Sequence, residues 1–486
     1  MGKLKEKYNS MSIQVKAAFW YLVCSLTQKG IAIITTPIFT RLMNTAQYGE
    51  FNVYSSWKEI VLILCTLRLS HGVVGPGLVK NEDDRAAFSS CMYTLTTVLV
   101  LIWGFLFFIF NKQLQSITEL SSLILFVMLV HVWTQAVWEI WAKEQRVLFR
   151  YRALVLITII VAVIRPIIGI IVVKHAEDKA VARIIEMTAV DFAAYIGLFV
   201  LSLYRGKRLY SKKYWIYALT INIPLIPHFL SQTILNSADR IMIERMVDSS
   251  SAGIYSLAYS ISVITVFLNN AMLQAMSPWT YRKLKDRNEN DIQKVGFTAL
   301  IIIAAINLLF IAFAPELVCV FAPTQYHEAI WIVSPIAMSV FFQFSYLLFV
   351  DIELYFERTK LIAFSTSLGA ILNVVLNYIF INFFGYYAAG YTTLFCYIFI
   401  AIVHYLAMIK VCKMNLDGNI VYSMHTWVSF SLAFLLVGFL LLASYTNTIL
   451  RIIIITGIVG ICFAYRKRII SIIKLISRSK NSFSSK

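Results

Sequence analysis

Residues 153–173 read ALVLITIIVAVIRPIIGIIVV, an almost unbroken run of apolar side chains. A helix needs roughly 20 apolar residues to cross the hydrocarbon of a bilayer, and this run supplies them. A single base, Arg165, followed at once by Pro166, interrupts it. The stretch therefore predicts a membrane-spanning helix with one charged position near its middle.

The same pattern recurs along the whole chain of 486 residues, of which 59% are hydrophobic and 14% charged. Soluble domains usually have about 25% charged residues. Short polar breaks delimit further apolar runs, and together they predict an all-α integral membrane protein with about 14 transmembrane helices. The predicted spans are residues 15–40, 51–74, 88–110, 120–142, 153–173, 184–203, 214–236, 253–277, 295–314, 330–350, 361–383, 388–409, 421–444 and 449–464.

The charges indicate how these spans are oriented. Lys and Arg number 43 against 25 Asp and Glu, and the bases concentrate in alternate loops, on the side that holds the N-terminus. Because Lys and Arg accumulate on the cytoplasmic side of membrane proteins, both termini are expected in the cytoplasm. The bases are spread over many short loops and form no compact patch, so they predict contact with membrane lipids and not with nucleic acid.

Two pairs of segments indicate an internal duplication. RLMNTAQYGEF at 41–51 matches RMVDSSSAGIY at 245–255, an offset of 204 residues, and RYR at 150–152 matches RTK at 358–360, an offset of 208. Such nearly equal offsets favour a six-helix unit repeated in parallel orientation. The predicted divisions are an N-terminal six-helix lobe at 1–206, a C-terminal six-helix lobe at 207–412, two additional transmembrane helices at 413–465 and a basic cytoplasmic tail at 466–486.

Three groups of residues resemble a known family. They are FTRLMNTAQYGEF at 39–51, Asp239-Arg240 with GIYSLA at 253–258, and NVVLN at 373–377 followed by Gly385 and Gly390. In these three groups of residues the chain is similar to the polysaccharide-transporter branch of the multidrug/oligosaccharidyl-lipid/polysaccharide flippase superfamily. This branch includes Wzx-type O-antigen flippases.

This resemblance implies a protein of the bacterial inner membrane that works by alternating access. It implies transfer of a polyprenyl-diphosphate-linked oligosaccharide from the cytoplasmic to the periplasmic leaflet, through a cationic cavity, for O-antigen or capsule biosynthesis. A polysaccharide polymerase and chain-length machinery are then further expected partners.

Four bases lie inside predicted spans and are the expected substrate-binding residues: Lys29, Lys58, Arg68 and Arg165. A charge at the bilayer centre costs about 2.5 to 3.5 kcal/mol, so it usually faces a wet interior. Ammonium and guanidinium groups donate charge-assisted hydrogen bonds to phosphate oxygens, which suits a diphosphate. The alternatives are a salt bridge from Lys29 to Glu59 and, for Arg68, a side chain that extends to the headgroups.

Other residues have expected roles in coupling and movement. Glu59 lies on a polar stripe of the second span, and we expect it to bind a proton or sodium ion that couples transport to a gradient. Pro37, Pro224 and Pro227 interrupt backbone hydrogen bonding within spans, and we expect a gate or hinge at these positions.

The remaining polar residues are interpreted as structural. Glu139, next to tryptophans, is typical of an interfacial belt. Asn373 and Asn377 lie one helical turn apart and are expected to join helices by hydrogen bonds. The seven cysteines stand singly, without metal-ligand spacing, so neither a metal site nor a cofactor is predicted.

Three other functions remain open at this stage. A drug or small-molecule antiporter would share the fold but handle cations in an acidic cavity, and a lipid II flippase would use the same phosphate chemistry on another sugar. A membrane polysaccharide polymerase would carry a large outward loop with catalytic residues, and no such loop, P-loop or metal cluster is found in the sequence. We therefore expect no enzyme and no catalytic residue.

Overall fold

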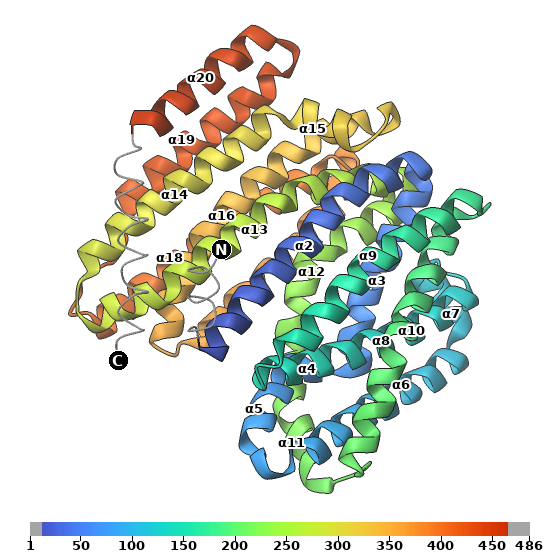
Figure 1. The fold of residues 1–486 in the computed structure, drawn as a ribbon. Coiled ribbons are helices and arrows are strands. Elements are labelled where there is room, and N and C mark those ends of the chain that lie inside the picture. The colour runs from blue at the N-terminus through green and yellow to red at the C-terminus, as the bar shows by residue number, and fades with distance from the viewer. Residues whose placement is uncertain (1–11, 465–486) are drawn as a thin grey trace, which may run out of the picture. The chain divides into compact units, whose positions relative to one another are not determined.

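The computed structural model describes residues 12–464, and these residues form helices without any strand (Figure 1). Within the described part of the chain, twelve stretches are long and apolar enough to cross a membrane. Two further helices complete the fourteen predicted spans: α3 (Thr45–Thr66), whose Glu50, Lys58 and Glu59 lower its hydropathy, and the shorter α20 (Thr448–Ala464). The predicted fold class, an all-α membrane protein, is confirmed.

The chain divides into two compact units, one ending at Ser237 and the other beginning at Ala238. From residue 12 onward, the first contains ten α-helices and the start of an eleventh, α12 (Ile226–Met246), with the short 3-10 turns η1 (Glu82–Asp84) and η2 (Ile223–Leu225). Its helices are α2 (Ile13–Leu42), α3, α4 (Leu69–Gly72), α5 (Val74–Lys80), α6 (Arg85–Ile109), α7 (Asn111–Thr118), α8 (Ser122–Val147), α9 (Tyr151–His175), α10 (Lys179–Gly206) and α11 (Lys212–Asn222).

The second unit is organised around α16 (Ile330–Tyr355), which is almost entirely buried and packs against α13, α14 and α18. Two short 3-10 turns, η3 (Thr324–Ala329) and η4 (Ser444–Thr446), join its helices. The other helices are α13 (Ser249–Lys285), α14 (Glu289–Ala312), α15 (Ala314–Phe321), α17 (Thr359–Phe384), α18 (Ala388–Asn415), α19 (Met424–Ala443) and α20.

The boundary between the compact units lies later than the predicted lobe boundary at 206/207. The predicted boundary follows from counting helices, whereas compactness follows from packing, and α11 packs against α6 and α4 of the first unit. The division into six-helix lobes stays a prediction.

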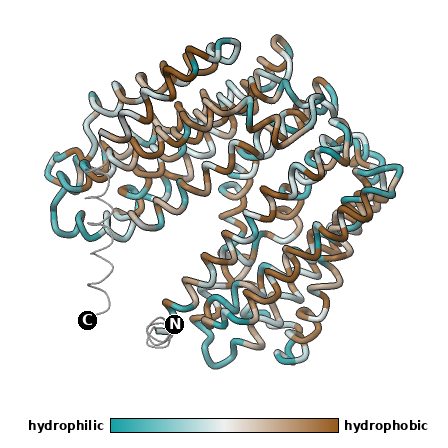
Figure 2. The backbone as a smooth tube through the Cα atoms, turned by 45° about the horizontal axis from the view of Figure 1, so that its top comes forward, coloured by the Kyte–Doolittle hydropathy of each residue, from teal (hydrophilic) through white to brown (hydrophobic). Residues whose placement is uncertain are grey.

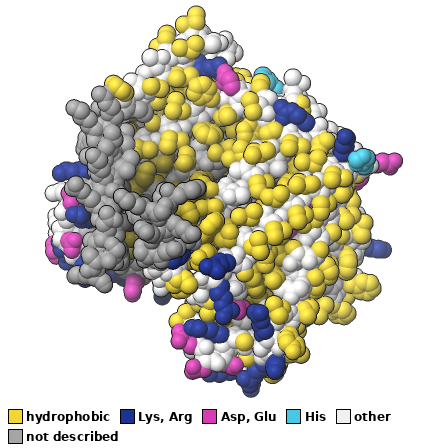
Figure 3. All heavy atoms as spheres, viewed as in Figure 1, with side chains coloured by type: hydrophobic (Ala, Val, Ile, Leu, Met, Phe, Trp, Pro, Cys, Tyr) yellow, Lys and Arg dark blue, Asp and Glu magenta, His cyan; other side chains and the backbone are white. Residues whose placement is uncertain are grey.

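Hydropathy is distributed as a bilayer requires. Apolar residues occupy the long middle stretches of the helices, and polar residues gather at their ends and in the connections (Figure 2). In the space-filling view, hydrophobic side chains cover wide areas of the visible face, and Lys and Arg are scattered in smaller groups, several of them near its edge (Figure 3). Helices satisfy their own backbone hydrogen bonds, which makes this arrangement stable in hydrocarbon.

The second span departs from its prediction as one helix over 51–74. Helix α3 ends at Thr66, and Leu67 and Arg68 both adopt left-handed backbone conformations, with φ of 50° and 49°. The side-chain amide of Asn222 donates to the Leu67 carbonyl at 2.7 Å, which satisfies an acceptor that a helix end leaves open. The sequence has neither Gly nor Pro at 67–68, so it carries no signal for this break.

The two predicted repeats share features at their helix ends. The side chain of Asn44 accepts from the backbone of Gln47 at 2.8 Å at the start of α3, and that of Asp248 accepts from Ser251 at 2.7 Å at the start of α13. These caps are 204 residues apart. Before α9 and α17, at the offset of 208 residues, Phe149 and Glu357 adopt left-handed conformations with φ of 53° and 58°. Matching caps and breaks support two parallel repeats.

Gly206 marks a close approach between α10 and α6. A Cβ there would overlap the backbone carbonyl oxygen of Ala86 and the side chain of Ser90. Because backbone cannot move aside cheaply, we expect Gly206→Ala to lower the free energy of unfolding by about 1 to 3 kcal/mol. Gly197→Ala on the same helix is the matched control, since no atom lies within 4 Å of its new Cβ. Thermal unfolding of the purified variants tests this, and equal Tm values would contradict the packing described.

Candidate functional site

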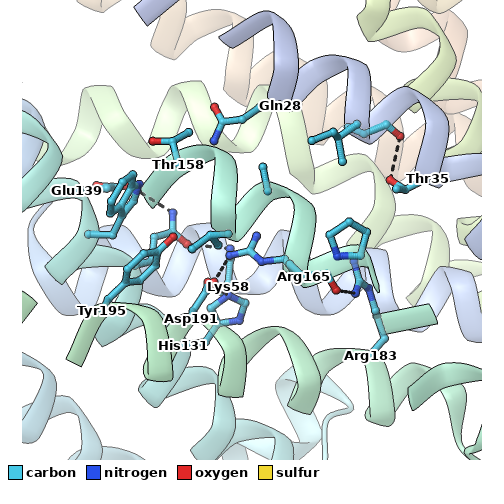
Figure 4. A pocket seen from close by; sticks show the side chains of 17 residues that line it. Gln28, Thr35, Lys58, His131, Glu139, Thr158, Arg165, Arg183, Asp191 and Tyr195 are labelled. Carbon is cyan, nitrogen blue, oxygen red and sulfur yellow. Dashed lines mark hydrogen bonds and ion pairs between the residues drawn. The ribbon is translucent and has the colours of Figure 1, made fainter. Parts of the chain in front are cut away.

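A cavity of about 470 Å³ lies within the first unit, between α2, α3, α8, α9 and α10 (Figure 4). Three bases, two carboxylates and a histidine contribute to its wall, together with uncharged polar and aromatic side chains. The polar and aromatic lining consists of Gln28, Thr35, Lys58, His131, Gln135, Trp138, Glu139, Thr158, Arg165, Arg183, Asp191 and Tyr195. Several segments that are distant in the sequence thus place hydrogen-bonding groups around one space inside a membrane-spanning bundle.

Arg165 on α9 is ion-paired with Asp191 on α10. The Asp191 side chain is only 4% exposed, whereas that of Arg165 is 29% exposed and lines the cavity. The other carboxylate oxygen of Asp191 lies 3.5 Å from Nε2 of His131, whose Nδ1 lies 3.0 Å from the hydroxyl of Tyr54. A buried carboxylate requires such partners, so this chain of contacts from four helices holds Arg165 at the wall.

A second network joins α3, α8 and the break after α3. Lys58 Nζ donates to Gln135 Oε1 at 2.8 Å and lies 3.3 Å from Glu59. The guanidinium of Arg68 contacts Glu59 at 3.0 Å and Glu139 at 3.2 Å. The left-handed backbone at Arg68 turns its side chain back along α3, so Arg68 forms ion pairs with both carboxylates.

Arg183 contributes a third base to the wall. Its Nη1 donates to Glu186 Oε2 at 2.5 Å, and its guanidinium lies 4.0 Å from the ring centroid of Phe39. Arg183 is not among the residues predicted from the sequence, because the predicted sixth span begins one residue later, whereas α10 begins at Lys179. The available signal was the Arg–Glu spacing of three residues, which is typical of an ion pair on one helical face.

Lys29 lies outside this cavity. The α2 residues that line it are Gln28, Ile31, Ala32 and Thr35, while Lys29 is exposed on the adjacent face. Successive helical residues point about 100° apart, so Lys29 points away from the cavity that the neighbouring Gln28 lines. No ion pair joins Lys29 to Glu59 in the described residues, because Lys58 and Arg68 contact Glu59 instead.

The three predicted hinge prolines occupy different settings. Pro37 lies inside α2, which continues past it to Leu42. Pro224 lies in the 3-10 turn η2 and Pro227 in the first turn of α12, so the seventh span is divided there into two helices. A break at these prolines agrees with the loss of backbone donors, and their role as a gate or hinge stays a prediction.

The electrostatic balance differs from the one inferred from the sequence. The resemblance implies a cationic cavity, and the sequence predicts an interfacial position for Glu139. In the structure Glu139 lines the cavity and Glu186 joins the networks, so four carboxylates face four bases. The bases of the α9–α10 wall are nonetheless the more accessible partners, since the side chains of Asp191 and Glu186 are 4% and 1% exposed.

The second unit holds a separate buried cluster around Asp239 of α12. The hydroxyls of Tyr255 and Thr393 donate to one carboxylate oxygen at 2.6 and 3.0 Å, and the side-chain amide of Asn377 donates to the other at 2.5 Å. Asn377 also accepts from Thr392, so it joins α17 to α12 and α18. The expectation that this asparagine ties helices together is confirmed, and the cluster joins residues from two of the three family-like groups.

The comparisons with known proteins agree with this architecture. Residues 14–283 match the family described as polysaccharide biosynthesis protein, and residues 224–379 match the MatE family. No curated protein matches the chain.

Several solved structures share the fold. The inward closed conformation of the lipid II flippase MurJ is 14% identical, with a TM-score of 0.70 over 92% of this chain and 99% of the other. An inward-facing multidrug resistance MATE family transporter is 12% identical, with a TM-score of 0.59 over 81% and 94%. A mutant of the Vibrio cholerae MATE transporter VcmN is 13% identical, with a TM-score of 0.53 over 84% and 98%. At these identities the likeness concerns the fold.

Proposed function

The chain belongs to the polysaccharide biosynthesis protein family, within the superfamily of flippases and transporters, and on that basis we propose that its cargo is a polyprenyl-diphosphate-linked oligosaccharide. It carries this lipid from the cytoplasmic to the periplasmic leaflet of the bacterial inner membrane by alternating access, for O-antigen or capsule biosynthesis. Both termini are cytoplasmic, and the polysaccharide polymerase and chain-length machinery act on the delivered unit.

The observation that carries this proposal is the orientation of the ion pairs in the first unit. On the α9–α10 wall, Arg165 and Arg183 line the cavity, while the side chains of their partners Asp191 and Glu186 are almost fully buried. On this wall an arriving anion therefore meets the guanidinium of Arg165 before it meets the carboxylate of Asp191. A cationic drug would need the opposite arrangement.

The paired state of these bases also suits a transporter. Arg165 and Arg183 are held in place before the substrate arrives, so little side-chain entropy is lost on binding. Phosphate oxygens that bind to Arg165 or Arg183 share the guanidinium with the existing carboxylate, and a guanidinium has donors enough for both. The phosphate is then bound by the guanidinium groups but repelled by the carboxylates of Asp191 and Glu186. This repulsion favours release of the substrate.

Purified protein in proteoliposomes tests the cargo. We expect transbilayer movement of a fluorescent polyprenyl-diphosphate oligosaccharide, little movement of the same glycan on a phosphate-free lipid, and no export of a cationic dye. Movement of the dye alone would establish the antiporter alternative. Movement of lipid II with exclusion of other lipid-linked glycans would establish the lipid II alternative and refute the proposed cargo.

Two carboxylates are candidates for ion coupling. Glu59 stays a proposal, although its contacts with Lys58 and Arg68 also suit a purely structural partner. Among the described residues, the hydrogen-bond donors to Asp239 are the neutral side chains of Tyr255, Thr393 and Asn377. An intramembrane carboxylate that pairs with no base is a usual marker of an ion or proton pathway, and hydroxyl and amide oxygens are ligands that hard cations accept.

We expect Asp239→Asn to abolish the stimulation of transport by an imposed ion gradient while leaving exchange without a gradient intact. The reason is that asparagine retains the polar contacts of the cluster but cannot carry the charge. Glu59→Gln is the parallel variant. Gradient-driven uptake by proteoliposomes decides between them: loss in only one variant assigns the coupling residue, and unchanged stimulation in both contradicts coupling at either site.

A further inference from the structure

A second cavity of about 750 Å³ lies at one end of the first unit, where α2 begins, α8 ends, α9 begins and α10 ends. Four bases line it: Lys16, Arg150, Arg152 and Arg205. Among residues 12–464, no carboxylate belongs to its lining. This basic pocket shares no lining residue with the cavity around Arg165, so the function proposed above leaves it unused.

The arginines of the basic pocket are available to an anion. Arg150, Arg152 and Arg205 are exposed, and none of them has an ion pair within the described residues. Glu144 on α8 influences Arg150 and Arg205 electrostatically without forming an ion pair with either. The three unpaired guanidinium groups around the basic pocket repel one another, and a bound anion would reduce that repulsion.

An apolar groove of about 340 Å³ continues from this pocket along α9. Tyr151 and Arg152 line both, and Trp20, Leu156 and Ile160 line the groove alone. Leu156 and Ile160 are 61% and 44% exposed. From Arg152 to Ile160 the helix rises about 12 Å, a length that accommodates much of a hydrocarbon chain. Helix α2 packs beside α9 and forms the other side of the groove (Figure 1).

The charged pocket suits the polar head of an amphiphile, and the adjoining lipid-facing groove suits its apolar tail. We propose that this site binds an anionic phospholipid of the surrounding membrane, with its phosphate among Arg150, Arg152 and Arg205 and an acyl chain along α9. Basic pockets between transmembrane helices at the membrane surface bind anionic headgroups in this way. A bilayer phospholipid is the occupant because the bases stand at the ends of the spans, at headgroup level, and the groove opens to the lipid side of the unit.

The test is lipid binding by the full-length purified protein. It is measured by native mass spectrometry and by titration with phosphatidylcholine vesicles that contain phosphatidylglycerol. We expect the wild type to retain phosphatidylglycerol through delipidation. The variant Arg150→Gln/Arg152→Gln/Arg205→Gln should bind it about a hundredfold more weakly, since each base near an anionic surface contributes several-fold. This variant must also show the wild-type helix content and unfolding temperature.

The matched control is Lys207→Gln/Lys212→Gln/Lys213→Gln, which removes the same charge from three exposed bases outside the pocket and should retain the lipid. Equal retention by the two triple variants would overturn the proposal. Competition by inorganic phosphate as effective as that by the lipid would also overturn it, because the groove would then contribute nothing. So would binding of a polyprenyl phosphate with no binding of phosphatidylglycerol, which would assign the pocket to the carrier instead.

Discussion

Arg165→Gln is expected to abolish transport and to destabilise the first unit. The substitution leaves Asp191 buried without its cation, and breaking a buried ion pair in this way costs about 3 to 5 kcal/mol. The loss of transport has a separate cause, because Arg165 is also the exposed base of the α9 wall. Thermal unfolding and flipping in proteoliposomes report the two effects independently.

The double variant Arg165→Gln/Asp191→Asn separates these causes. Two neutral amides can hydrogen-bond to each other, and the asparagine introduced on α10 would keep a partner in His131, so most of the lost stability should return. Transport should stay absent, since no positive charge remains at the Arg165 position. Recovery of transport along with stability would show that Arg165 serves only as a structural partner of Asp191.

Gly169→Ala is expected to reduce transport several-fold with little change in stability. A Cβ at Gly169 would overlap the guanidinium of Arg183 and lie 2.9 Å from Glu186 Oε2. The end of a long side chain can move aside, so the helices need not separate, but Arg183 would leave its position beside Phe39 at the cavity wall. The readout is the flipping rate at saturating and at low substrate concentration.

Gly30→Ala on α2 is the control for this prediction, because its Cβ would meet no atom within 4 Å. Both variants replace glycine by a better helix former, which by itself stabilises a helix by about 1 kcal/mol. A difference in transport between them therefore reflects the displacement of Arg183. Equal rates for Gly169→Ala and wild type would remove Arg183 from the proposed binding wall.

Much of the fold could be predicted because its determinants are local. The apolar length of residues 153–173 predicts a span without reference to any neighbour, and the structure has α9 over nearly the same residues. The match between 41–51 and 245–255 likewise reflects local chemistry, since Asn44 and Asp248 cap equivalent helices. Hydropathy and capping are properties of a single segment, so the sequence alone reveals them.

The site could be predicted only in part, because it depends on how each helix is rotated about its axis. Lys58, Arg68 and Arg165 do lie in the ion-pair networks of the cavity. Lys29 does not, since packing against α9 turns Gln28 to the cavity instead. Glu139 has the sequence surroundings of an interfacial residue, and Arg68, which contacts it, lies at the break after α3. That break has no Gly or Pro to mark it.

If this protein is a flippase for a lipid-linked glycan, cells that lack the protein should retain that glycan in the cytoplasmic leaflet. The measurement is the access of an external glycan-cleaving enzyme to the labelled lipid-linked oligosaccharide in spheroplasts of a strain without a paralogue. We expect the glycan to accumulate protected on the cytoplasmic leaflet, and we expect the wild-type gene to restore access while Arg165→Gln/Asp191→Asn does not. Normal access in cells without the gene would contradict the proposed function.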